Sequence, residues 1–370
     1  MQPIIKPAET DSERLGIYRL RYDVYVDELR RYRGVADHEN RHFSEPDDDN
    51  ARLYCALDAA GEVIGTMRHF WGGDGPFSDR VVEQYDLELF LDDIALNEII
   101  VGERFMVSRA HRGTDLIYRL FCTYLAFAND KRIQLIFGDC EPHLLNLYLG
   151  LGFRTYSGKN ISSPETGYLI PLIMIPEDVD HFRAIRSPLA DVVKDFGSDS
   201  RVPACVSRLL EAGSAVASEK FTPHARYWED IETALKLVQG DRPLLFDGLN
   251  EEQIELCLTK SNLIECRTGD HLIKKGNTAN NMYICLSGTL EVRADEGVVA
   301  VISPGDVFGE MAFLLDSPRT MDVFAVSDNV SVLSLSESIV RKIIESDPET
   351  AATLMLNIAK MLCLKLVNSS

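Results

Sequence analysis

The chain of 370 residues is poor in basic side chains. It has 38 lysines and arginines against 58 aspartates and glutamates, a formal net charge of −20. Proteins that bind nucleic acids present a basic surface to the phosphate backbone. The acidic balance therefore disfavours a nucleic-acid partner, and it makes any local excess of arginine informative.

Cysteine occurs eight times but never in a metal-binding or redox arrangement. None forms a Cys-x-x-Cys pair or stands at zinc-site spacing from histidine. We therefore expect no metal ion, and we interpret the cysteines as small core residues. They are Cys55, Cys122, Cys140, Cys205, Cys257, Cys266, Cys285 and Cys363.

Long apolar runs are also missing. No run looks long enough to span a membrane, and the N-terminus shows no signal peptide, so we expect a cytoplasmic protein without a membrane span. The length predicts two domains, and an apolar content of 45% allows each to bury a sizeable core.

Periodic patterns divide the chain into three segments. Residues 1–178 mix helical and strand periodicity. Residues 179–243 are broken by prolines and glycines such as Pro188 and Gly197 and predict a helical connector, with helices over 178–185 and 227–238. In the first segment, helices are expected over 11–31, 115–129 and 142–151, and strands over 53–57, 63–70, 103–107 and 134–138.

Residues 244–370 alternate short apolar runs with glycine turns and end in two helices. Within them, Gly309 lets the backbone approach a phosphate and turn into a short helix. Glu310 can accept a hydrogen bond from a ribose hydroxyl, and Arg319 offers a planar fork for a cyclic phosphate. The residues expected to contact a nucleotide are Phe308, Gly309, Glu310, Met311, Ala312, Pro318, Arg319 and Thr320.

This pattern resembles the phosphate-binding cassette of the cyclic-nucleotide-binding domains in the catabolite gene activator, protein kinase A regulatory subunits and gated channels. The resemblance implies a β jelly roll with flanking helices and an effector that is cyclic AMP or cyclic GMP. In that family the last helix often pairs subunits, so a homodimer is open here, beside packing of the helix on its own barrel. Its apolar stripe is Leu354, Ile358, Met361 and Leu362.

Basic residues are concentrated between Arg104 and Arg119, where four arginines stand against one acid. An expected strand leads there into a glycine-containing loop and the start of a helix, an arrangement that cradles anions. Residues 146–153, which read Asn-Leu-Tyr-Leu-Gly-Leu-Gly-Phe, follow about one helix and one strand later.

These two pieces resemble the Gcn5-related N-acetyltransferase superfamily. The resemblance implies an α+β fold with a mixed sheet, and an acyl thioester, either acyl-CoA or an acyl carrier protein, bound by the loop. It makes Tyr148 the general acid for the departing thiolate, although the same tyrosine is equally compatible with a core aromatic. The residues that it assigns to the acyl carrier are Phe105, Met106, Val107, Arg109, Arg112, Gly113 and Thr114.

Segments nearer the N-terminus resemble the acyl-homoserine-lactone synthases and N-acyl amino acid synthases of that superfamily. The resemblance implies that Arg21, Asp48 and Arg68 shape the site of an amino acceptor. That branch has a glutamate three residues before the arginine matched by Arg104, and Val101 stands there in this chain. The candidate catalytic residues are Tyr148, Glu103, Glu98 and Arg104. For the run from Asp47 to Asp49, a solvated loop is the alternative to the acceptor-site role of Asp48.

The sequence therefore predicts a cyclic-nucleotide-regulated N-acyltransferase that acts on an amine. A carboxylate or an ordered water is needed to deprotonate the amine, and backbone amides near Phe105 to Val107 are expected to stabilise the oxyanion. A free amino acid is the expected acceptor and a protein lysine an alternative. The other alternative is a catalytically silent acyl-carrier-binding domain joined to a nucleotide sensor.

Overall fold

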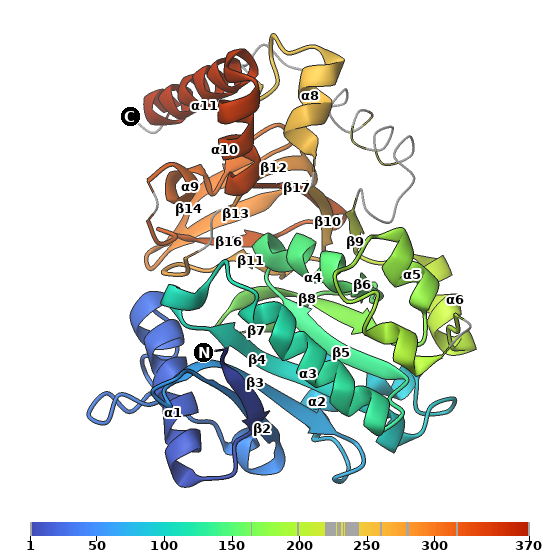
Figure 1. Ribbon diagram of the computed structural model, residues 1–370. Coiled ribbons are helices and arrows are strands. Elements are labelled where there is room, and N and C mark those ends of the chain that lie inside the picture. The colour runs from blue at the N-terminus through green and yellow to red at the C-terminus, as the bar shows by residue number, and fades with distance from the viewer. Residues whose placement is uncertain are drawn as a thin grey trace. The chain divides into compact units, whose positions relative to one another are not determined.

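The chain forms two compact units in the computed structural model (Figure 1). Unit 1 comprises residues 1–140, 147–157 and 170–213, and unit 2 comprises residues 141–146, 158–169 and 214–370. The structure describes residues 2–163, 165–197, 200–218, 227, 231, 233, 244–259, 261–278, 281–315 and 317–368. The helix expected over 227–238 lies almost wholly outside the described residues.

Unit 1 is built on one mixed sheet, as the sequence predicted. Its strands are β1 (Ile4–Pro7), β2 (Arg52–Leu57), β3 (Val63–Trp71), β4 (Ile99–Val107), β5 (Leu135–Cys140), β6 (Arg154–Thr155) and β8 (Gly167–Met174). They are hydrogen-bonded in the order β1-β2-β3-β4-β5-β8-β6. Among these described strands β4 and β5 run parallel, and the other neighbouring pairs are antiparallel.

Helices pack against both faces of this sheet. Gly102 on β4 faces the long helix α3, because a Cβ atom there would lie 2.6 Å from the hydroxyl of Tyr124. The next residue, Glu103, points to the opposite face, where Arg80 of α2 reaches it. The helices are α1 (Asp11–Arg21), α2 (Asp79–Gln84), α3 (Leu116–Asp130), α4 (Leu145–Leu151), α5 (Val179–Ala184) and α6 (Ala204–Ala212).

The first helix differs in its second half from the expected helix over 11–31. Thr10 and Glu13 form a capping box that starts α1. After Arg21 the helix continues as a π-helix, η1 (Tyr22–Glu28). The 3-10 turns are η2 (Pro46–Asn50), η3 (Leu87–Leu89), η4 (Leu96–Glu98), η5 (Arg109–His111), η6 (Pro142–Leu144) and η7 (Val193–Phe196).

Unit 2 contains two antiparallel sheets and confirms the predicted β domain with flanking helices. The strands are β9 (Val216–Ser218), β10 (Asn262–Cys266), β11 (His271–Ile273), β12 (Asn281–Ser287), β13 (Leu290–Ala294), β14 (Gly297–Ile302), β15 (Val307–Phe308), β16 (Asp322–Ala325) and β17 (Val330–Ser336). Their orders are β15-β12-β17-β10-β9 and β11-β16-β13-β14. A short strand, β7 (Ile161–Ser163), pairs with the first residues of β8. The helices are α8 (Glu251–Leu258), α9 (Glu310–Leu315), α10 (Glu337–Ser346) and α11 (Pro348–Asn368).

The apolar stripe of α11 packs within unit 2. Leu354, Ile358 and Met361 are buried in the core of this unit, and Leu362 packs against it. Of the two alternatives for this stripe, packing on its own barrel is the one that the structure describes.

The same helix corrects the expectation that no apolar run is long enough to cross a membrane. Residues Pro348–Val367 have a mean hydropathy of 1.5 and pass that test by length and composition. Exposed apolar residues near the end of the helix, such as Leu366 and Val367, add to the hydropathy of the buried stripe. One such helix is weak evidence for a membrane span, because core helices pass the same test.

Candidate functional site

Strand β4 contains a β-bulge at Arg104 and Phe105, which together lie opposite Met67 of β3. Arg104 has a φ of +54°, in the left-handed region that residues other than glycine rarely occupy. Successive side chains of a regular strand point to opposite faces. Because of the bulge, Glu103 and Arg104 both reach one group of charged side chains.

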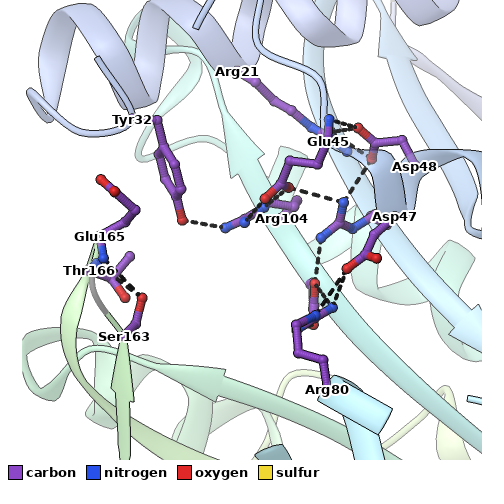
Figure 2. Close-up of polar contacts among 12 residues, drawn as sticks. Arg21, Tyr32, Glu45, Asp47, Asp48, Arg80, Arg104, Ser163, Glu165 and Thr166 are labelled. Atoms are coloured by element: carbon purple, nitrogen blue, oxygen red, sulfur yellow. Dashed lines mark hydrogen bonds and ion pairs between the residues drawn. The ribbon is translucent and has the colours of Figure 1, made fainter. Parts of the chain in front are cut away.

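Arg21, Asp48 and Arg68 meet in the interior of unit 1. Figure 2 shows Arg21 beside Asp48. Nη1 of Arg21 donates to both oxygens of Asp48, at 2.8 and 2.7 Å, and Nη1 of Arg68 donates to Oδ1 at 2.9 Å. None of the three is more than 1% exposed. Asp48 is fixed by η2, where its Oδ2 accepts from the backbone N–H of Glu45 at 2.8 Å. The structure thus brings together the three residues assigned to the acceptor site.

Two more acids surround Arg68. Its Nη2 donates to Glu103 at 2.6 Å, and its Nη1 lies 3.0 Å from Oε2 of Glu45. Glu45 also accepts two hydrogen bonds from Arg104, at 2.6 and 2.5 Å, and Arg104 donates to the hydroxyl of Tyr32 at 3.1 Å. Glu103 and Arg104, two of the predicted catalytic residues, therefore lie beside the acceptor-site residues.

Sequence reasoning missed Arg80, which closes this group. It pairs with Asp47 at 2.7 Å and with Glu103 at 3.1 Å, so Asp47 is not simply a solvated loop residue. Arg80 lies on the short helix α2 and belongs to no motif, so the sequence offered no signal for it. We name the group the arginine–acid cluster; its members are Arg21, Arg68, Arg80, Arg104, Glu45, Asp47, Asp48 and Glu103.

Burial and charge act in opposite directions on the acids of the cluster. Burial raises the pKa of Glu45, Asp48 and Glu103, but the neighbouring guanidinium groups outweigh it and leave each pKa below its ordinary value. For Asp48 the strongest such cation is Arg21. These carboxylates are therefore held ionised and are poor proton acceptors at neutral pH.

The parallel ladder between β4 and β5 is short. Among the described residues it joins Ile99–Val101 to Leu135–Phe137. Beyond it, the Phe105–Val107 segment, expected to supply oxyanion donors, is paired with β3. Along this stretch β4 has no ladder partner in the described part of β5.

Tyr148 and Glu98 lie outside the arginine–acid cluster. Tyr148 is half-buried on α4, and its ring packs against Phe121 and Phe153 with centroids 6.3 and 5.5 Å apart. This packing suits a core aromatic, so the general-acid role stays a prediction. Oε2 of Glu98 accepts from the backbone N–H of Ala95 at 3.1 Å and caps the turn η4.

The basic loop before α3 is braced by its own polar groups. Thr114 donates to the carbonyl of His111 at 2.7 Å, and Gly113 has a φ of +78°. Arg112 forms an ion pair with Glu28, and Arg119 donates to a backbone carbonyl near the N-terminus. With Arg104 in the arginine–acid cluster, three of the four arginines in this segment have partners within the protein.

Arg109 is the fourth arginine of this basic segment. Its side chain is exposed and has no ion pair among the described residues. Of the other residues assigned to the acyl carrier, Phe105 stacks on Phe121, and Met106 and Val107 are buried.

In unit 2, Arg319 is buried, with 5% of its surface exposed. Its Nη1 donates to the carbonyl of Gly309 at 2.6 Å, and its Nη2 donates to the carbonyl and side-chain oxygens of Asn281 at 2.6 and 2.9 Å. All these acceptors are neutral, and no carboxylate of the described residues lies within ion-pair distance. Burial lowers the pKa of Arg319, as expected for a cation without a paired anion.

Gly309 and Glu310 lie beside this arginine. Gly309 has a φ of +75°, and a Cβ atom there would be 2.5 Å from Nη1 of Arg319, so the turn requires glycine. Glu310 begins α9 and is 6% exposed. Its Oε1 accepts from Nζ of Lys365 on α11 at 2.8 Å, and Lys365 also donates to the carbonyl of Val307 at 2.5 Å.

The remaining cassette residues divide by exposure. Phe308 and Ala312 are buried, while Met311, Pro318 and Thr320 are exposed. A buried cation that bonds neutral oxygens only, next to a close glycine turn, suits a singly charged cyclic phosphate. Among the described residues, no group of three or more His, Cys, Asp or Glu side chains is arranged to hold a metal ion.

Comparison with known proteins supports the assignment of unit 2. Residues 263–347 match the family model of the cyclic nucleotide-binding domain. The chain is 33% identical over 113 residues to the cAMP-dependent protein kinase regulatory subunit of Debaryomyces hansenii, covering 30% of this chain and 22% of that one. It is 32% identical over 139 residues to Glutaminase 2 of Bradyrhizobium diazoefficiens, covering 37% and 22%. The chain thus spans about a fifth of the length of these two curated relatives.

Solved structures are similar to each part of the chain. A CoA-dependent acyl-homoserine lactone synthase is 18% identical with a TM-score of 0.38, and the match covers 56% of this chain and 99% of that one. The catabolite activator protein of Thermus thermophilus is 25% identical with a TM-score of 0.30, covering 34% of this chain and 59% of that one.

Proposed function

We propose that this protein is an N-acyltransferase that moves an acyl group from an acyl thioester to an amine under the control of a cyclic nucleotide. The observation that carries the acyl-transfer half is the convergence of Arg21, Asp48 and Arg68 in one buried cluster with Glu103. The match of residues 263–347 to the cyclic nucleotide-binding domain supports the sensor half.

Acyl transfer requires two substrates to be held together, which contributes up to about 7–11 kcal/mol in well-oriented reactions. The thioester would lie along β4 beyond the bulge, with backbone amides near Phe105 to Val107 facing the oxyanion. Arg109 and the loop at Gly113 would hold the phosphate-bearing arm of the donor. Tyr148 would protonate the thiolate, and the amine, by preference a free amino acid, would lie at the arginine–acid cluster.

The nucleotide would bind unit 2 through Gly309, Glu310 and Arg319, with its phosphate on the arginine and its ribose on the glutamate. In the structure Glu310 is held by Lys365, so a ribose hydroxyl would compete with a residue of α11. Such competition would alter the last helix when the nucleotide binds. A coupling of about 1–3 kcal/mol would give a response of several-fold or more in acyl transfer.

A second candidate is a silent domain that binds an acyl carrier without turnover. The observation that favours it is the state of the basic segment, in which Arg104, Arg112 and Arg119 already have partners within the protein. In that case the sensor alone would be active.

Thiol release from acyl-CoA donors of several chain lengths and from acyl carrier protein tests the proposal. Each donor is assayed with mixed amino acids or a lysine-containing peptide, with and without cyclic AMP or cyclic GMP. We expect turnover with amino acids that changes when one nucleotide is added. Turnover with the peptide alone would favour a protein acceptor, and nucleotide binding without turnover would favour the silent domain.

A further inference from the structure

Asp139 is an acid near the arginine–acid cluster that none of the motifs includes. It lies two residues beyond Phe137, the last residue of β5 that is paired with β4. Alternate residues of a strand share a face, so Asp139 and Phe137 point to the same side of the sheet. The ring of Phe137 contacts Tyr85 on that side, and the hydroxyl of Tyr85 bonds Asp139. Asp139 therefore stands on β5 just past the point where its ladder with β4 ends.

Two neutral side chains hold this carboxylate. Its Oδ2 accepts from the hydroxyl of Tyr85 at 2.5 Å and from Nε2 of Gln84 at 3.0 Å. Gln84 in turn accepts from Arg80 at 3.0 Å, and Arg80 bonds Glu103 at 3.1 Å. Asp139 is thereby joined to the cluster through α2, but it forms no ion pair among the described residues.

Asp139 differs from the acids of the cluster in that no arginine of the cluster balances its charge. The cluster contains four arginines and four acids, so its formal charges cancel. Asp139 adds a fifth acid that no arginine of the cluster neutralises. When it is ionised, the site carries one excess negative charge, which suits the ammonium form of an amine acceptor.

We infer that Asp139 is the proton acceptor that deprotonates the amine in acyl transfer, an inference that rests on the proposed function. The acids of the cluster form ion pairs with arginines and act as fixed negative charges. Asp139, held by Tyr85 and Gln84 at the end of the β4–β5 ladder, has an ionisable group free of a cationic partner.

The reaction balances with this residue as the base. The carboxylate of Asp139 takes one proton from the ammonium group of the acceptor. The amine nitrogen then bonds to the carbonyl carbon of the thioester, and the carbon–sulfur bond breaks. Tyr148 gives its proton to the departing thiolate and takes the second proton from the nitrogen. One proton leaves to solvent when Asp139 is deprotonated again.

The electrostatic surroundings of Asp139 suit this role. Burial, with a smaller contribution from the charge of Glu103, outweighs the hydrogen bonds of Tyr85 and Gln84 and the charge of Arg104, and raises the pKa of Asp139 to about 6. Tyr156 also interacts with Asp139, since burial raises the pKa of this tyrosine and the charge of Asp139 raises it further. A base acts best when its pKa lies near the working pH.

Asp139→Asn tests the inference, because asparagine keeps the size of the side chain and its acceptor oxygen for Tyr85. We expect turnover to fall about 10²- to 10⁴-fold, the usual contribution of acid–base catalysis. The acidic limb of kcat/KM, expected near pH 6 in the unaltered protein, should disappear. Asp74→Asn, which alters an exposed ion pair with Arg52, is the matched control and should keep both rate and pH profile.

Tyr85→Phe provides a second variant whose readout a structural role would not produce. Its hydroxyl bonds the charged carboxylate and lowers the pKa of Asp139, so its loss should move the acidic limb to higher pH. We treat Tyr85 as a positioning residue. An acidic limb that stays in place in both variants would overturn the inference.

The stability of the protein reports the titration of Asp139 separately from turnover. A carboxyl whose pKa is higher in the folded state stabilises the fold below its unfolded pKa and loses that contribution as pH rises through about 6. Relative to the unaltered protein, Asp139→Asn should therefore gain stability as the pH rises from about 4 to about 6, the window set by the unfolded and folded pKa values. Turnover that survives Asp139→Asn overturns the inference alone, whereas no turnover from any thioester overturns the proposed function and the role of Asp139 with it.

Discussion

The buried arginines of the two units are neutralised in different ways. Arg68 in unit 1 lies within ion-pair distance of three carboxylates, whereas Arg319 in unit 2 donates to neutral oxygens only. Burial lowers the pKa of both side chains, but the charges of Glu103 and Glu45 outweigh it for Arg68 and leave that pKa raised. Both arginines are buried, and they differ in the charge that surrounds them.

This difference separates a structural arginine from a ligand-binding one. A buried cation already paired with carboxylates gains little from an incoming anion, and removing it leaves those carboxylates uncompensated. A buried cation that is held by carbonyls keeps its positive charge and gains an ion pair when a phosphate arrives. We therefore expect substitution of Arg68 to affect folding, and substitution of Arg319 to affect binding.

Arg68→Met should produce the largest effect. The methionine fills similar space but leaves Glu45, Asp48 and Glu103 without their shared cation, and breaking a buried ion pair in this way costs about 3–5 kcal/mol. Hydrogen exchange of peptides from β2 and β3, followed by mass spectrometry, measures this loss in unit 1 by itself.

Arg52→Gln is the matched control for Arg68→Met. Arg52 pairs with Asp74 on the surface, with side chains 41% and 39% exposed, and such pairs contribute less than about 1 kcal/mol. If the two variants lost equal stability, the buried ion pairs of Arg68 would stabilise unit 1 no more than a surface pair does, and Arg68 would not be a structural arginine.

Much of the fold could be predicted from periodicity. The helix expected over 115–129 is found as Leu116–Asp130, and the strands expected over 53–57 and 63–70 are found as Arg52–Leu57 and Val63–Trp71. The helix has one buried face, which imposes the period of its apolar residues, whereas the two strands are buried at consecutive positions and stand out as short runs joined by a turn. The nucleotide cassette could also be predicted from the sequence, because its residues lie within thirteen positions of one another.

The rest depended on contacts between distant segments. The bulge at Arg104 could not be predicted, because no glycine marks the left-handed position and an arginine adopts that conformation instead. Arg80 meets Glu103, and Gln84 meets Asp139, only when α2 packs on the sheet. The change from α-helix to π-helix at Tyr22 likewise leaves no sign in the spacing of apolar residues.

Arg319→Gln should have the second largest effect, on binding rather than on folding. Glutamine keeps donors for the neutral oxygens but removes the charge that a phosphate would meet. A hydrogen bond to a charged group contributes about 1.5–3 kcal/mol, which corresponds to a loss of nucleotide affinity of roughly 10- to 150-fold. Titration calorimetry with cyclic AMP and cyclic GMP measures this loss and shows which base is preferred.

Arg341→Gln serves as the control for Arg319→Gln, because Arg341 lies on α10 in the same unit and its exposed side chain pairs with Glu337. Its affinity for either nucleotide should be unchanged. An equal loss of nucleotide affinity in both variants would show that the charge of Arg319 does not bind the phosphate, and Arg319 would then not be a ligand-binding arginine.

Lys365→Met should have the smallest effect and the opposite sign. Lys365 holds Glu310 at 2.8 Å from α11, so in the structure the expected ribose acceptor already has a cationic partner within unit 2. Because the lysine side chain is 43% exposed, this ion pair contributes no more than about 1 kcal/mol. Its removal should free Glu310 and raise nucleotide affinity up to about 5-fold.

Lys360→Met, on an exposed turn of the same helix, should leave affinity unchanged. A lower affinity in Lys365→Met would mean that this lysine stabilises the bound state, so that α11 closes over the nucleotide instead of competing with it.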